Sequence, residues 1–158
     1  MSAYYDKVKQ NLTSGGLTCY TDKIINGDVL VCYIKKFRLA WIATQLNTFI
    51  ILGTKDNISK PDIESFSHSC FEYALKNNRG WPRGVQSGIG SIAVLTGSNV
   101  DDQAQAYCLE NLKKHWSAFE IPVIHNSNTN ELFFFRNNPI WGRIYFPYFR
   151  KLIESNLR

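Results

Sequence analysis

Residues 137–150 constrain the fold more than any other stretch of this 158-residue chain. They place five aromatic side chains, two prolines, a glycine and two arginines between an apolar strand candidate and a final helix. Pro147 is expected to start that helix, because proline suits the first helical turn. So much apolar surface must either pack into the core or form a binding surface of the protein.

The first interpretation assigns most of these rings to the core, beneath the last helix. The second makes the surplus a binding surface, because Trp, Tyr and Arg are the side chains enriched at interaction hot spots. Our candidate binding residues in this stretch are Trp141, Arg143, Tyr145, Tyr148 and Arg150. Three more come from the glycine-rich segment 80–90 and the residue before it: Arg79, Trp81 and Arg83.

The positive charge is concentrated in the same part of the sequence. Residues 1–135 carry 13 basic and 12 acidic side chains, whereas residues 136–158 carry five basic side chains and one acidic one. This is a local basic bias and not a Lys/Arg-rich nucleic-acid-binding tail.

Hydrophobic periodicity predicts one α+β domain over residues 1–158, with a mixed α/β arrangement as the alternative. Helices are expected over residues 3–12, from Pro61 to about 77, over 101–116 and from Pro147 onward. About six to seven strands, mostly antiparallel, would form the sheet, beginning with a meander of about four. A β-α-β-β-α unit would follow.

Two turns organise the predicted meander. Asn26 and Gly27 are typical of a type I′ hairpin, whose central residues need positive φ angles. Lys35 and Lys36 would turn the chain a second time, ahead of strands over 37–44 and 46–52.

The four cysteines, at positions 19, 32, 70 and 108, form no Cys-x-x-Cys pair. Their wide spacing and apolar neighbours predict reduced core thiols. The chain also lacks a signal-peptide pattern and a run of about 20 apolar residues, so we expect a cytoplasmic protein with no membrane partner.

No local motif marks a catalytic site, a metal site or a cofactor site, so none is assigned. The glycines of segment 80–90 follow a helix and precede a strand, the reverse of the order in a phosphate-binding loop. His125, at the end of an apolar strand, is the one plausible acid–base residue. A surface or hydrogen-bonded structural histidine is the simpler interpretation.

We therefore predict a non-catalytic interaction domain that binds a protein partner or a second copy of itself. Binding of single-stranded nucleic acid is the first alternative, because bases stack on aromatic rings and arginines contact phosphates. The second alternative is an enzyme whose His, Cys and Arg residues converge only in the folded chain.

Overall fold

The computed structural model describes residues 2–84, 86–137, 139 and 143–158. In these residues the four helices are α1 (Ala3–Ser14), α2 (Lys60–Asn77), α3 (Asp102–Glu110) and α4 (Phe146–Asn156). A short 3₁₀ helix, η1, covers Leu39–Trp41. The main-sheet strands are β1 (Thr18–Ile24), β2 (Gly27–Arg38), β3 (Thr44–Thr54), β5 (Ser87–Gly97), β7 (Lys113–His115), β8 (Ala118–Asn126) and β9 (Glu131–Phe133). A separate two-stranded sheet pairs β4 (Asn57–Ile58) with β6 (Asn99–Val100).

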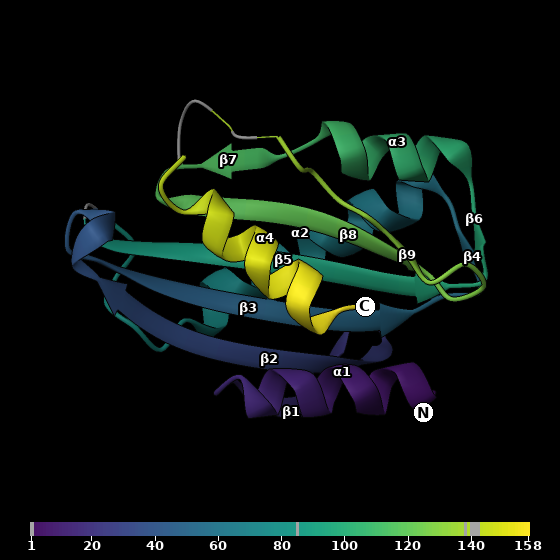
Figure 1. Cartoon of the computed structure of the whole chain (residues 1–158), viewed down its shortest axis with the longest axis horizontal. Helices are drawn as coiled ribbons and strands as arrows, with labels where there is room; N and C mark the ends of the chain where they lie inside the picture. Colours follow the sequence, from purple (N-terminus) through teal and green to yellow (C-terminus); the bar gives the residue numbers. More distant parts are fainter. Residues whose placement is uncertain (1, 85, 138, 140–142) are drawn as a thin grey trace.

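The main sheet has the strand order β1-β2-β3-β5-β8-β7, and β9 also pairs with β8 (Figure 1). Its centre is parallel, because β3 pairs with β5 and β5 with β8 in the same direction. The other four pairings are antiparallel. The predicted α+β class with a mostly antiparallel sheet is confirmed.

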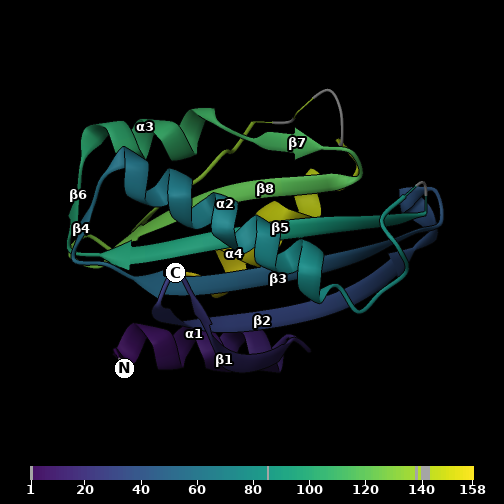
Figure 2. The same cartoon turned by 180° about the vertical axis from the view of Figure 1, so that it is seen from behind.

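Helices cover both faces of the sheet. Helices α1 and α4 lie on the face seen in Figure 1, and α2 and α3 lie on the face seen in Figure 2. Side chains on β3, β5 and β8 are therefore buried on both sides, as expected for parallel strands. In the part of the chain that the structure describes, no helix is both long enough and apolar enough to cross a membrane.

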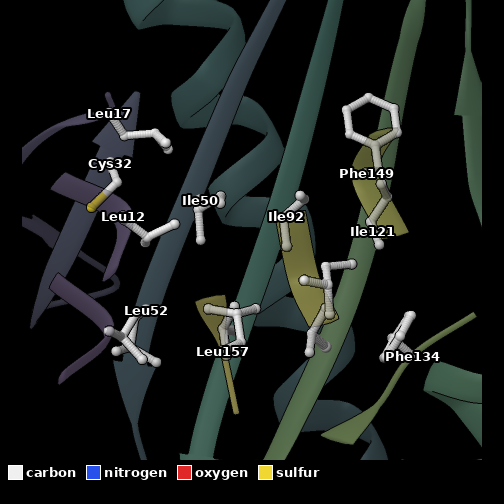
Figure 3. Packing of buried hydrophobic residues seen from close by; sticks show 14 of the residues in the cluster. Leu12, Leu17, Cys32, Ile50, Leu52, Ile92, Ile121, Phe134, Phe149 and Leu157 are labelled. Atoms are coloured by element: carbon white, nitrogen blue, oxygen red, sulfur yellow. The ribbon is translucent and has the colours of Figure 1, made fainter. Parts of the chain in front are cut away.

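Two hydrophobic clusters, one on each face of the sheet, pack the sheet against its helices. The cluster under α1 and α4 includes Ile92 and Ile121 from the sheet and Phe149 from α4 (Figure 3). Phe149 fits there because Gly90 opposite it has no side chain; a Cβ atom at Gly90 would overlap the Phe149 ring. The aromatic residues of α4 therefore pack mainly as core, as the first interpretation predicts.

The predicted β1–β2 hairpin exists, but its turn lies one residue earlier. Ile25 and Asn26 occupy the central positions, with φ angles of 49° and 60°, and Ile24 pairs with Gly27. An isoleucine at positive φ is strained, since its branched Cβ crowds the backbone there. The position of Asn-Gly in a sequence thus identified the hairpin but not its register.

Cys19 and Cys32 form a disulfide, so the prediction of four reduced thiols is wrong for this pair. The two residues are direct partners in the antiparallel β1–β2 register, with their Cα atoms 4.1 Å apart. Counting from the Ile24–Gly27 pair places them at a non-hydrogen-bonded position, where opposite side chains approach most closely. Cys70 and Cys108 are free and buried.

Two further predictions are corrected by tertiary pairing. Lys35 and Lys36 do not form a turn, because β2 runs through them to Arg38 in continuous register with β3. The helix expected over residues 101–116 ends at Glu110, and β7 then pairs with the start of β8. In the segment after Glu110, the hydrogen bonds available at an open strand edge outweigh the helical propensity.

Candidate functional site

The predicted binding residues of the C-terminal stretch have different surroundings. Tyr148 is only 8% exposed, and its ring packs 5.1 Å from that of Trp41. Tyr145 is half-buried, 5.9 Å from Trp41, and its hydroxyl donates to Thr44 Oγ1 over 3.3 Å. The main role of these two tyrosines is therefore to pack α4 against η1, and they present little surface to the solvent.

The remaining candidates of that stretch are two arginines and a tryptophan. Arg143 is exposed, just ahead of α4. Arg150 is half-buried, with its guanidinium 5.6 Å from the centre of the Phe146 ring. Trp141 lies outside the described residues.

The segment 78–84 lies at the same end of the molecule as Arg143, and its backbone is fixed by buried polar side chains of the sheet. The N–H of Trp81 donates to Gln45 Oε1 over 2.9 Å, and its carbonyl accepts from Ser87 Oγ, also over 2.9 Å. Gly80 lies so close to Gln45 and Asn47 that an added Cβ atom would overlap both side chains. The indole of Trp81 nevertheless remains 49% exposed.

A second polar contact fixes this segment from the opposite side. Ser117 Oγ donates to the Gly84 carbonyl over 2.7 Å, which ties the segment to the turn between β7 and β8. That turn presents Trp116, which is 63% exposed and lies 5.7 Å from the Arg83 guanidinium. On the other side, Trp81 contacts the ring of Phe37 at 6.4 Å.

Four segments therefore meet at the end of the sheet where β3, β5 and β8 begin: residues 35–44, 78–84, 113–117 and 143–145. We call this surface the basic end; it lies to the left in Figure 1 and to the right in Figure 2. The four segments contain eight of the 18 Lys and Arg residues and none of the 13 Asp and Glu residues. The rest of the chain, with ten basic and 13 acidic residues, carries a net charge of −3.

Most of these cations have no acidic partner. Among the described residues, Lys113 alone of the eight has a carboxylate oxygen within 4.0 Å, that of Glu64. The molecule is thus electrically polarised, with +8 at one end and −3 over the remainder. The charge count along the sequence located only Arg143 of this set in the basic C-terminal part.

The basic end also exposes most of the large apolar side chains that face solvent. Among the described residues, six of the eight prominently exposed large hydrophobic side chains lie there: Phe37, Leu39, Ile42, Trp81, Trp116 and Ile144. Ile42 and Ala43 both have positive φ, at 56° and 54°, and Ser117 beside Trp116 has a φ of 50°. Strained turns therefore present Ile42, which is 80% exposed, and Trp116.

Buried next to the basic end is a carboxylate that the sequence reasoning missed. Glu120 lies in β8, is 1% exposed, and accepts hydrogen bonds from Ser67 Oγ at 3.2 Å and His115 Nε2 at 3.1 Å. A buried carboxylate needs such partners, because its desolvation is costly. Burial, followed by the charge of Glu120, raises the pKa of the Cys70 thiol, which makes that cysteine a poor nucleophile.

His125 has the surroundings of a structural histidine. Its ring is 2% exposed and stacks on Tyr4 with the ring centres 3.7 Å apart. Its Nε2 donates to Asn130 Oδ1 over 3.0 Å, so Nδ1 of the neutral ring accepts from Thr96 Oγ1 over 2.8 Å. Burial lowers the pKa of His125, partly offset by the Asn130 hydrogen bond.

The opposite end of the sheet, where β3 and β5 finish, holds a hollow of about 250 Å³. Lys55 and Asp62 at its rim form an ion pair at 2.7 Å. Hydrogen bonds from Lys55 and Ser59 lower the pKa of Asp62 to about 2. This carboxylate therefore stays charged, and its oxygens already have partners within the protein. Within the described ranges, no cluster of three or more His, Cys, Asp and Glu side chains could hold a metal ion.

Comparison with protein-family models, with curated proteins and with the solved structures found no match to this chain.

Proposed function

We propose that this protein is a binding domain that captures an acidic partner protein through its basic end. The observation that carries the proposal is the fixed backbone of Trp81, hydrogen-bonded on both sides by Gln45 and Ser87 under an indole that stays 49% exposed. A large aromatic side chain that is already positioned before binding loses little entropy on contact, which is typical of interaction hot spots.

The charge of the basic end favours an acidic partner over a second copy of the chain. A symmetric dimer through this surface would bring two sets of eight cations face to face, with no carboxylate in the four segments to offset them. An acidic protein surface would instead be steered toward the basic end and would meet complementary charge there.

The exposed aliphatic side chains favour a protein over a nucleic acid. Leu39 and Ile42 are 79% and 80% exposed. Nucleic-acid bases stack on aromatic rings and need no aliphatic contacts, whereas protein interfaces bury aliphatic side chains at their core. Strain at Ile42, whose φ is 56°, is consistent with a residue kept for contact and not for stability.

Single-stranded nucleic acid remains the second candidate, because the rings of Phe37, Trp81 and Trp116 are exposed among the eight cations. Leu39→Ser and Ile42→Ser separate the two candidates. Both substitutions should weaken binding of a protein partner while leaving binding of an oligothymidylate unchanged. An oligonucleotide affinity that falls steeply with salt, with no peptide binding, would favour the second candidate.

A phage-displayed random peptide library, selected on the wild-type protein, tests the proposal. We expect enriched peptides that combine Asp or Glu with aromatic or aliphatic residues. They should fail to bind Trp81→Ala and should still bind Leu109→Ala, which removes an apolar side chain 41% exposed on α3, away from the basic end. Peptides without acidic residues, or peptides that ignore Trp81→Ala, would contradict the proposal.

The cytoplasmic location stays a prediction. It depended partly on four reduced cysteines, and the disulfide between Cys19 and Cys32 removes that argument, because disulfides persist mainly in oxidising compartments.

A further inference from the structure

A small groove between the end of β2 and helix α4 gathers cations without acids. Its volume is about 150 Å³. Lys36 and Arg38 line it from β2, and Tyr148, Lys151 and Ser155 line it from α4. Lys36 and Arg38 are two residues apart on one strand, so their side chains lie on the same face of the sheet.

Aromatic rings hold two of these cations in place. The Lys36 ammonium lies 5.4 Å from the centre of the Tyr148 ring, and the Arg38 guanidinium lies 5.3 Å from it. Arg38 is also 4.8 Å from the Trp41 ring. The rings themselves are fixed, since Tyr148 and Trp41 are 8% and 3% exposed.

Two like charges that share one ring repel each other, and cation–π attraction offsets that repulsion only in part. A nearby carboxylate would remove the conflict. Within the described chain, however, no Asp or Glu oxygen lies within 4.0 Å of Lys36, Arg38 or Lys151. The positive charge of the groove is therefore left for an anion from outside the protein to neutralise.

We propose that this groove binds a dianionic phosphoryl group, held by Lys36, Arg38 and Lys151. The planar guanidinium of Arg38 suits two oxygens of a phosphate at once, and the two ammonium groups supply point charges. The Ser155 hydroxyl offers a further donor at the rim. A volume of about 150 Å³ is below that of pockets for whole organic ligands, which suits the charged group alone.

This site shares Lys36 and Arg38 with the basic end but differs from it in its other residues and in its ligand. Lys151 and Ser155 belong to α4 and lie outside the four segments of the basic end. Phosphate binding should therefore survive Trp81→Ala, and partner binding should survive Lys151→Gln. Failure of one proposal is thus distinguishable from failure of the other.

Isothermal titration with inorganic phosphate tests the site directly. Phosphate should bind the wild-type protein in a buffer whose ionic strength is matched with sodium chloride. Lys151→Gln and Arg38→Gln should each weaken binding about tenfold, the effect of one lost charge-assisted hydrogen bond. Lys76→Gln, an exposed lysine on α2, is the matched control and should leave binding unchanged.

Equal heats from phosphate and chloride, or phosphate affinity unchanged in Lys151→Gln, would overturn the proposal. Arg38→Lys keeps the charge but loses the planar fork, so an affinity between those of the wild type and Arg38→Gln supports bidentate contact. Two other probes identify the source of the phosphoryl group: O-phosphoserine, and phosphatidylcholine vesicles with added phosphatidic acid. Tighter binding of either probe than of inorganic phosphate supports the site and names the source.

Discussion

The side chain of Gln45 accepts a hydrogen bond from the backbone N–H of Trp81 over 2.9 Å, although the two residues are 36 positions apart. Gln45 is 7% exposed and lies on β3, one of the two central strands of the sheet, whereas the Trp81 indole is about half exposed to solvent. A buried polar residue thus determines where an exposed aromatic ring is presented. This relationship links the core of the fold to its proposed binding surface.

Gln45→Leu should loosen the segment 78–84 without disturbing the rest of the sheet. The substitution leaves the Trp81 N–H without its acceptor, which costs about 1–3 kcal/mol of stability. Hydrogen exchange at the Trp81 amide should accelerate at least about tenfold. The control is Gln103→Leu, an exposed position on α3. Unchanged exchange at Trp81 would show that Gln45 does not fix this segment.

Ile42→Asn should stabilise the protein and weaken partner binding together. Asparagine tolerates the positive φ at this position, so relief of strain should add about 1 kcal/mol of stability. Losing an 80% exposed aliphatic side chain should also reduce affinity for selected acidic peptides. Ile144→Asn, whose φ is not positive, should give no gain in stability. Chemical denaturation and peptide titration measure the two effects, and a stability loss in Ile42→Asn would contradict the strain argument.

The oxidation state of the cysteines can be counted. Protein denatured without reductant should present two free thiols, Cys70 and Cys108, and four after reduction. Because the disulfide closes a loop across 13 positions, its removal in Cys19→Ser/Cys32→Ser should cost about 3 kcal/mol. Four free thiols before reduction would contradict the Cys19–Cys32 bond.

Acid should destabilise the fold through His125. Burial holds the pKa of this histidine below its unfolded value, so the unfolded chain binds the proton more readily. The stability due to neutral His125 is therefore fully present above a pH of about 6.5 and is lost as the pH falls below it. Unfolding free energies measured by urea denaturation at several pH values should fall less steeply in His125→Gln. Equal slopes in the two proteins would show that His125 does not contribute.

Local patterns were enough to predict the fold class and most of the helices. Pro61 and Pro147 each lie within the first turn of a helix, where their missing N–H costs no hydrogen bond. The alternatives that depended on long-range pairing could not be decided from the sequence. The sequence around Lys35 and Lys36 does not reveal that pairing with β3 extends β2 through both residues. The sequence around His115 does not reveal that this segment pairs with the edge of β8.

The candidate site shows the same limit. Arg79, Trp81 and Arg83 were recognised from their residue types, and the structure brings them to the end that also holds Arg143. Phe37, Leu39, Ile42 and Trp116 were not, because they belong to two other segments, 35–44 and 113–117, and only the folded sheet brings the four segments together. One signal was present: the same four segments lack any acidic residue.

The indole N–H signals in the NMR spectrum test the central claim most directly. The chain has four tryptophans, whose signals can be assigned by replacing each with phenylalanine. On addition of an acidic peptide selected on the wild-type protein, the signals of Trp81 and Trp116 should shift, while that of Trp41, which is 3% exposed, should stay in place. Peptide binding that leaves both the Trp81 and Trp116 signals unmoved would contradict a binding surface at the basic end.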